Sequence, residues 1–95
     1  MHSTHVSIVI TNYNYGQYLP RCIRSCMSQR NIDQEIIVVD DCSDDETEFV
    51  IMPFLNHVTF IQNEENVGVA ESSNIGLRTS KSQFYIRVDA DDFIS

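Results

Sequence analysis

Short apolar runs alternate with polar segments along this chain, and four of the runs are rich in β-branched or aromatic residues. They span residues 6–10, 35–39, 58–61 and 84–88. Short runs with few polar interruptions are typical of strands that are buried on both faces of a parallel sheet. The pattern therefore predicts four strands.

Helices are predicted in the first and last of the segments between these strands. A helix is predicted over residues 18–29, with Pro20 tolerated in its first turn. Another is predicted over residues 69–80, where Gly76 is a weak point because glycine disfavours a helix interior. The first of these helices has its apolar positions on one face: Leu19, Cys22, Ile23, Cys26 and Met27.

The middle segment carries a motif that is typical of a helix start. Ser43 and Glu46 have the spacing of a capping box, in which each side chain bonds a free backbone N–H of the first turn. Asp44 and Asp45 would then lie in that turn, where they favour the helix dipole. The helix behind them carries Phe49, Val50 and Met52, and Pro53 ends or kinks it.

The element order is therefore βαβαβαβ, which predicts an α/β fold with a Rossmann-like parallel sheet. Right-handed crossovers place helices on both faces of such a sheet. A chain of 95 residues forms one small domain at most. Ligands of these sheets bind at the carboxyl ends of the strands, near the point where the strand order reverses.

Every predicted strand is followed by a polar cluster, so the clusters are expected to converge on one rim of the sheet. They cover residues 11–14, 40–45, 63–68 and 89–92. Residues 63–68 include Asn66 and Gly68, which we interpret as turn and cap residues. The sequence has neither a dinucleotide-binding GxGxxG motif nor a P-loop.

The last cluster, Asp89-Ala90-Asp91-Asp92, places three carboxylates within four residues. Like charges at this separation repel one another unless a cation lies between them. Hard oxygen ligands suit Mn²⁺ or Mg²⁺, and Mg²⁺ usually shares its site with substrate phosphates. The cluster therefore predicts a metal–diphosphate site, with an acidic loop that lacks a ligand as the alternative.

Two further clusters could contact a ligand. Asp40 and Asp41 end the second strand, where a carboxylate can accept hydrogen bonds from a ribose hydroxyl or a base N–H. The alternative is that they cap a helix or face water. Thr11 and Tyr13 follow the first strand, where a hydroxyl and a ring could hold a base or merely shape the turn.

Charge and composition narrow the classes of partner. The net charge of −8, from 14 acidic and 6 basic residues, argues against a nucleic-acid binder, which needs a basic face.

Three cysteines without a CxxC pattern indicate reduced thiols and a cytoplasmic location. The three histidines lack ligand-like spacing, and we expect His57 to be exposed. The polar start predicts no signal peptide, and no apolar stretch has membrane-spanning length.

Four segments together resemble the family 2 glycosyltransferases, which have the GT-A fold. They are VSIVITNYN (residues 6–14), EIIVVDDCSDDET (35–47), NVGVAESSNIG (66–76) and YIRVDADD (85–92). The motifs stand in the family's order and cover nearly the whole chain from residue 6 on. The resemblance implies an inverting sugar transfer from a nucleotide-diphosphate sugar, a UDP-sugar in our interpretation, to a hydroxyl acceptor, plausibly in polysaccharide synthesis.

The resemblance also implies roles for individual residues. Thr11 and Tyr13 would line the nucleotide pocket, with Tyr13 against the base. Asp41 would bond the base, and Asp40 would support that loop. Asp89 would bond the ribose or reach the metal through water.

The same resemblance assigns the metal to the last cluster. Asp91 would coordinate the Mn²⁺ or Mg²⁺ that bridges the diphosphate, and Asp92 is adjacent. Two positions depart from the family's pattern. Cys42 replaces the usual Gly, so the turn must avoid a positive φ or bear strain. Ser73 stands where the family often has Arg, which removes a cationic contact to the diphosphate, and Arg78 is not an obvious substitute.

The family continues with an acceptor-binding half that supplies the general base, and the sequence contains no such half. We therefore expect residues 1–95 to be the nucleotide-sugar-binding portion, without a catalytic base of its own. The alternative is a non-catalytic module that binds a nucleotide or metal, or that assembles with another chain. The last strand would be an exposed edge, which makes a homodimer plausible.

Overall fold

The computed structural model describes residues 5–28, 33–82 and 84–91. Strands and helices alternate along the chain, so the predicted βαβαβαβ order is confirmed. His2 and Asp92 lie outside the described residues. The elements are β1 (His5–Asn12), α1 (Leu19–Met27), β2 (Asp33–Asp40), α2 (Thr47–Val50), the 3-10 helix η1 (Met52–Phe54), β3 (Thr59–Gln62), α3 (Val69–Thr79) and β4 (Phe84–Asp89).

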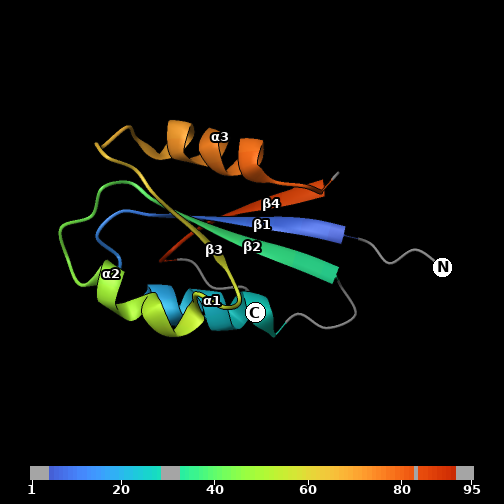
Figure 1. Ribbon diagram of the computed structural model, residues 1–95, viewed down its shortest axis with the longest axis horizontal. Coiled ribbons are helices and arrows are strands. Elements are labelled where there is room, and N and C mark those ends of the chain that lie inside the picture. Colours follow the sequence, from blue (N-terminus) through green and yellow to red (C-terminus); the bar gives the residue numbers. More distant parts are fainter. Residues whose placement is uncertain (1–4, 29–32, 83, 92–95) are drawn as a thin grey trace.

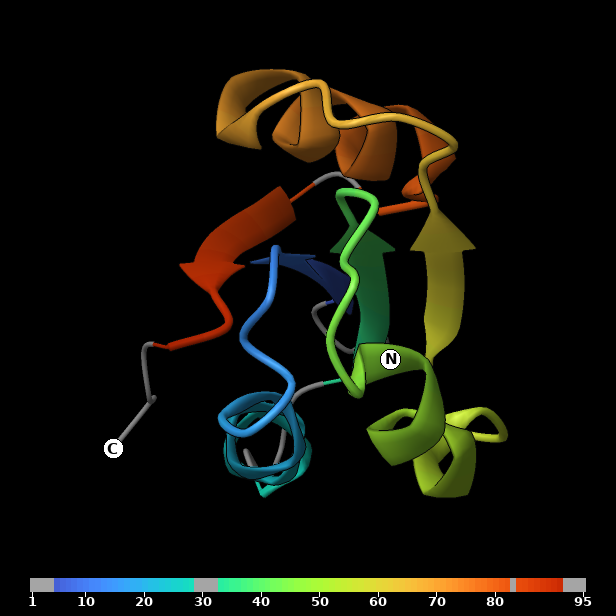
Figure 2. The same ribbon diagram turned by 90° about the vertical axis from the view of Figure 1, so that its left-hand side faces the viewer.

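The four strands form one parallel sheet in the order β3-β2-β1-β4. Helix α3 covers one face of the sheet, and α1 and α2 cover the other (Figures 1 and 2). The chain first adds strands on one side of β1 and then places β4 on the other side. The strand order therefore reverses between β1 and β4, which is where such sheets bind ligands.

Alternation along the strands divides the core between the two faces. Ile8 and Ile10 of β1 point toward α1, whereas Val9 between them points toward α3. The α1 face includes Leu19, Ile23, Ile36, Val38, Ile51 and Val88. The α3 face is smaller and consists of Val9, Ile37 and Val39, with Ile61, Ile75 and Leu77 packed against them.

The middle helix is shorter than predicted, and the capping box is wrong. Helix α2 begins at Thr47, and its N-cap side chain makes no capping bond. The Ser43 hydroxyl donates instead to Oδ1 of Asp40 at 2.6 Å, because that buried carboxylate needs donors. Asp45 lies before the helix rather than in its first turn, and it accepts bonds from the backbone of Thr47 (3.0 Å) and of Gly16 (2.9 Å).

The apolar residues of this segment also lie differently from a buried helix face. Phe49 and Met52 are 76% and 61% exposed, whereas Ile51 is buried. The segment turns from α2 into η1 at Met52, so the chain does bend near Pro53. Only a short stretch of the segment therefore contributes to the core.

Gly76 has a packing role that helix propensity did not reveal. A Cβ atom at this position would lie 2.4 Å from Cγ1 of Val9 and 3.2 Å from Cγ2 of Val39. Helix α3 approaches the sheet closely because position 76 has no side chain. The cost of a glycine inside a helix is thus offset by closer packing of α3 on β1 and β2.

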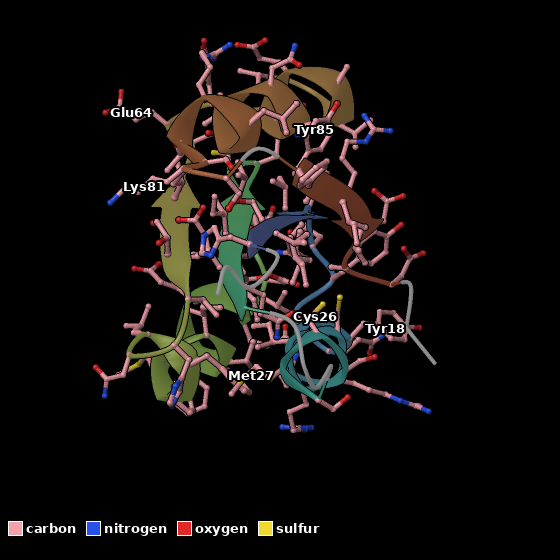
Figure 3. All side chains as sticks on the ribbon, turned by 90° about the vertical axis from the view of Figure 1, so that its right-hand side faces the viewer. Tyr18, Cys26, Met27, Glu64, Lys81 and Tyr85 are labelled. Atoms are coloured by element: carbon pink, nitrogen blue, oxygen red, sulfur yellow. The ribbon has the colours of Figure 1, made fainter. Side chains whose placement is uncertain are left out.

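Cys22 and Cys26 behave as expected for small core residues. Cys22 and Cys26 are buried, Cys42 is exposed, and all three cysteines are reduced. Figure 3 shows Cys26 on the side of α1 that faces the sheet and Met27 on the side that faces α2 and η1. His57 is exposed, as predicted. Among the described residues, no helix is both long and apolar enough to cross a membrane.

Strand β4 is an edge strand, as predicted, and it is poorly covered. Val88 is buried against the α1 face, but Phe84, Tyr85 and Ile86 are 58%, 55% and 49% exposed. Tyr85 lies on the α3 side of the strand (Figure 3). Helix α3 packs on β1 and β2, so it leaves most of this side of β4 open.

Candidate functional site

A pocket of about 420 Å³ lies at the carboxyl edge of the sheet, beside the start of α3. Residues from all four of the predicted polar clusters contribute to the pocket or to its supporting bonds, so the predicted convergence is confirmed. The pocket lies where the strand order reverses between β1 and β4. It is lined by Thr11, Asn12, Tyr13, Tyr15, Asp41, Asn66, Gly68, Val69, Ser72, Asp89 and Asp91.

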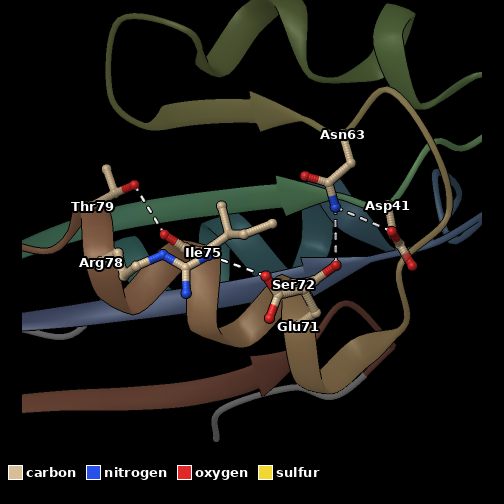
Figure 4. A network of polar contacts seen from close by, with 7 residues as sticks. All are labelled: Asp41, Asn63, Glu71, Ser72, Ile75, Arg78 and Thr79. Carbon is tan, nitrogen blue, oxygen red and sulfur yellow. Dashed lines mark hydrogen bonds and ion pairs between the residues drawn. The ribbon is translucent and has the colours of Figure 1, made fainter.

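Asp41 joins the end of β2 to the loop before α3. Its Oδ1 accepts hydrogen bonds from the backbone N–H of Val67 at 2.8 Å and from Nδ2 of Asn63 at 3.1 Å. Its Oδ2 accepts one from the N–H of Gly68 at 2.8 Å. Nδ2 of Asn63 also contacts the Ser72 hydroxyl, so a single amide links Asp41 to α3 (Figure 4).

These bonds keep the Asp41 carboxyl ionised. Burial raises the pKa of Asp41, but the hydrogen bonds from Val67, Asn63 and Gly68 stabilise the anion more strongly, so the pKa lies below its usual value. The Ser72 hydroxyl also helps to lower this pKa. Oδ2 accepts one hydrogen bond, from Gly68, and keeps acceptor capacity because each carboxylate oxygen can accept about two bonds. The pocket wall therefore presents a fixed negative acceptor at the end of β2.

Asp40 is fully buried and does not line the pocket. Its Oδ1 accepts hydrogen bonds from Nδ2 of Asn12 at 2.8 Å and from the Ser43 hydroxyl at 2.6 Å, and its Oδ2 accepts the N–H of Ser43 at 3.0 Å. Asn12 ends β1, so the Asp40 carboxylate ties the turn after β2 to the turn after β1. Through these bonds, Asp40 supports the loop that carries Asp41.

Cys42, between Asp41 and Ser43, adopts a positive φ of 66°. The sequence predicted that a non-glycine residue here either avoids a positive φ or bears backbone strain. The structure shows the second outcome. The Cys42 thiol faces outward and donates weakly to the carbonyl oxygen of Glu64 at 3.6 Å. The bonds around Asp40 and Asp41 hold this turn in place despite its backbone strain.

Thr11 and Asp89 form the opposite wall. The Thr11 hydroxyl donates to Oδ1 of Asp89 at 2.9 Å, and the N–H of Ala90 donates to the Thr11 carbonyl oxygen at 2.9 Å. The second of these bonds extends the pairing of β1 and β4 one residue past the last register pair, Thr11 and Asp89. Asp91, two positions beyond Asp89, also lines the pocket and is exposed.

Two aromatic residues, Tyr13 and Tyr15, line the pocket. Tyr13 is 47% exposed and Tyr15 is 39% exposed, so both can contact a ligand. The loop that carries them is held by Asn14, whose N–H donates to the Ser43 hydroxyl at 2.8 Å and whose Oδ1 accepts the N–H of Asp44 at 2.9 Å. Sequence reasoning selected Tyr13 and missed Tyr15, although both belong to the same turn.

A divalent cation fits the donor set on the β4 side. Asp89 and Asp91 supply two carboxylates, which are hard oxygen ligands that Mg²⁺ or Mn²⁺ prefers. Across residues 5–28, 33–82 and 84–91, no three acidic, histidine or cysteine side chains are grouped so that they could hold a metal ion by themselves. The remaining ligands would therefore come from water and from the bound molecule, as is usual for Mg²⁺.

The comparisons with known proteins agree on one family. The sequence model of the protein family described as Glycosyl transferase family 2 matches residues 7–95 of this chain. An uncharacterized glycosyltransferase of Haemophilus influenzae is 39% identical over 87 residues, which are 92% of this chain and 29% of that protein. The chain therefore spans less than a third of the length of this relative.

Two solved structures share the fold. S. aureus TarS, residues 1–349, in complex with UDP-GlcNAc superposes with a TM-score of 0.88 at 29% identity, over 97% of this chain and 28% of that one. A mannosyltransferase from Pyrobaculum calidifontis, in complex with GDP-Man and Mn²⁺, superposes with a TM-score of 0.84 over 90% of this chain and 27% of its own. It is 22% identical, so this second likeness concerns the fold alone.

Proposed function

Because the chain belongs to glycosyl transferase family 2, with the α/β fold of the GT-A glycosyltransferases, we propose that its pocket binds the nucleotide diphosphate of a sugar donor. We take the donor to be a UDP-sugar. The observation that carries this proposal is the pair of acidic walls, with Asp41 on one side of a pocket of about 420 Å³ and Asp89 and Asp91 on the other. TarS, which is 29% identical, was solved with UDP-GlcNAc.

The wall after β2 is suited to the base. Asp41 keeps acceptor capacity on Oδ2, next to the N–H groups that it holds in place. A uracil ring offers one N–H donor at its edge, which an anionic acceptor would bond. The exposed Tyr13 ring would lie against the base, Thr11 lines the pocket from the end of β1, and Asp40 is the buried support.

The wall after β4 is suited to the diphosphate and its cation. Asp91 would hold Mn²⁺ or Mg²⁺ directly, and Asp89 would bond the ribose or reach the ion through water. When bound, the ion would stabilise the charge on the departing nucleoside diphosphate. The Thr11 hydroxyl fixes one Asp89 oxygen, so the other oxygen is oriented for these contacts.

The proposed role of residues 1–95 is the donor side of an inverting transfer to a hydroxyl acceptor, plausibly in polysaccharide synthesis. The chain spans 29% of the H. influenzae relative. We place the base that deprotonates the acceptor outside these residues. The reduced cysteines are compatible with a cytoplasmic setting.

Calorimetric titration tests the proposal. UDP, GDP and UDP-GlcNAc would be titrated into the 95-residue chain with Mn²⁺ and with chelator, for wild type, Asp91→Ala and Asp44→Ala. Asp44 is an exposed aspartate that does not line the pocket, so it is the matched control. We expect metal-dependent UDP binding that Asp91→Ala removes and Asp44→Ala retains.

Two results would contradict the proposal in different ways. Metal binding without nucleotide affinity would favour a non-catalytic metal module. Tighter binding of GDP than of UDP would retain the donor site and reject uracil as its base.

The exposed edge of β4 favours assembly as a second candidate function. Phe84, Tyr85 and Ile86 present apolar surface beside unpaired backbone groups. If two copies pair there, light scattering will give a molar mass that rises with concentration, and Ile86→Lys will abolish the rise. Met52→Lys, at an exposed apolar residue on η1, is the control. A monomer at all concentrations excludes this candidate.

A further inference from the structure

The residues that line the pocket carry only negative charge. Three carboxylates line it, from Asp41, Asp89 and Asp91, and its lining residues, all of them described, include neither Lys nor Arg. A nucleoside diphosphate brings several further negative charges. One divalent cation offsets only part of this total, so a cationic side chain close to the pocket is expected to contribute.

Arg87 lies on the side of β4 that faces the pocket. It pairs in register with Val9 of β1, whose side chain belongs to the α3 face. Val88, the next residue, points to the opposite face. Because side chains alternate along a strand, Arg87 and Asp89 share the α3 face, about 7 Å apart along the strand. An extended arginine side chain covers that distance.

Among the described residues, the guanidinium of Arg87 has one weak partner. Its Nη1 donates to the Ser73 hydroxyl at 3.4 Å, across the open side of β4 that α3 leaves uncovered. Ser73 follows Ser72, which lines the pocket. In the described part of the chain, no carboxylate is within ion-pair distance of Arg87. A guanidinium has five N–H donors, so most of them remain available to a ligand.

Ser73 provides the room for this arrangement. It is buried on α3 and small, and Arg87 reaches over it from the neighbouring strand. A long cationic side chain at position 73 would compete with Arg87 for the same space. A small residue on the helix and an arginine on the strand therefore form a complementary pair. Arg78, farther along α3, is already paired with Glu71 at 3.2 Å on the outer side of the helix (Figure 4).

We propose that Arg87 binds the phosphoryl oxygens of the nucleoside diphosphate, and that Ser73 is its resting partner when the pocket holds no ligand. The planar guanidinium matches the geometry of phosphate oxygens and stays charged at all relevant pH values. The positive charge thus comes from strand β4 instead of helix α3. This inference rests on the proposed function and adds a residue to that site.

Binding measurements on the 95-residue chain test the inference. UDP would be titrated by calorimetry with Mn²⁺, and uridine by NMR, for wild type, Arg87→Gln, Arg87→Lys and the control Arg78→Gln. We expect Arg87→Gln to weaken UDP binding about tenfold or more, since a hydrogen bond to a charged group is lost. Uridine affinity should stay within about twofold because uridine has no phosphate, and Arg87→Lys should retain part of the UDP affinity.

The outcomes separate this inference from the proposed function. If Arg87→Gln binds UDP within twofold of wild type, the inference is wrong and the donor site stands. If Arg87→Gln weakens uridine and UDP equally, Arg87 has only a structural role and the inference is also wrong. If the wild type binds no UDP, both are overturned. A selective loss for UDP, with Arg78→Gln unchanged and thermal unfolding preserved, supports Arg87 as a diphosphate ligand.

Discussion

The hydroxyl of Thr11 donates a hydrogen bond of 2.9 Å to Oδ1 of Asp89, across 78 positions of sequence. The bond joins the carboxyl end of β1 to that of β4, at the point where the strand order reverses. It fixes one carboxylate oxygen of Asp89 at the pocket wall. The orientation of an acidic residue in the candidate site thus depends on the first strand of the sheet.

Replacing Thr11 by Val tests this relationship. The shapes are similar, so we expect the free energy of unfolding to fall by only about 0.5–1.5 kcal/mol, the usual value of one hydrogen bond. Binding of UDP with Mn²⁺ should weaken by more than this, because Asp89 loses its orientation. Urea unfolding and calorimetry measure the two effects. Thr59→Val, at an exposed position in β3, is the control, and equal UDP affinity in both variants would contradict the expectation.

The hydrogen bonds to Asp41 predict a large effect on stability. The N–H groups of Val67 and Gly68 donate to different oxygens of Asp41. In Asp41→Asn one of these oxygens becomes an NH₂ group, which cannot accept a hydrogen bond, so one of the two N–H groups loses its partner. We expect the free energy of unfolding at pH 7 to fall by about 1–3 kcal/mol, the cost of a buried donor without a partner. Urea unfolding measures this fall, and Asp44→Asn, at an exposed aspartate, should show almost none of it.

The same carboxyl makes a pH-dependent contribution to stability. The pKa of Asp41 is lowered in the folded state, so its stabilising effect is present above the ordinary aspartate pKa of about 4. It is lost as the pH falls through the lower folded value. The stability difference between wild type and Asp41→Asn should therefore be constant from pH 7 to 5 and shrink below pH 4. A difference that grows toward low pH would contradict this sign.

The close approach of α3 predicts that Gly76→Ala destabilises the fold, although alanine favours helices. The added Cβ would lie 2.4 Å from Cγ1 of Val9, which is too close unless the Val9 side chain or the helix shifts. We expect a loss of about 1–3 kcal/mol, as for other overpacked cores. Asn74→Ala, at an exposed position of the same helix, should be neutral or slightly stabilising. Thermal unfolding of both variants checks the contrast.

We proposed that residues 1–95 bind the donor and that the catalytic base lies outside them. This proposal predicts little or no sugar transfer by the 95-residue chain alone. It would bind the donor but lack the base that activates the acceptor hydroxyl. Release of UDP from UDP-GlcNAc in the presence of candidate acceptors, followed by chromatography, measures this directly. Transfer at a rate comparable to complete glycosyltransferases would refute the assignment of the base to another part of the protein.

Some features of the site were open to prediction from local patterns, and others were not. The turn after β1 was recognisable from its polar residues, yet Tyr15 was missed because nothing local separates its ring from one that packs elsewhere. The Ser43–Glu46 capping box failed for a related reason. Its spacing is right for a cap, but the buried carboxylate of Asp40 takes the Ser43 hydroxyl instead.

Hydrophobic periodicity along the chain was enough to establish four parallel strands, their alternation with helices and the shared edge of their polar ends. These properties follow from short-range rules on burial and crossover handedness. Tertiary packing alone determined that Asp41 holds the start of α3, that Gly76 is needed against Val9, and that Arg87 reaches Ser73. Such contacts join residues far apart in the sequence, and their geometry exists only once helix α3 rests on the sheet.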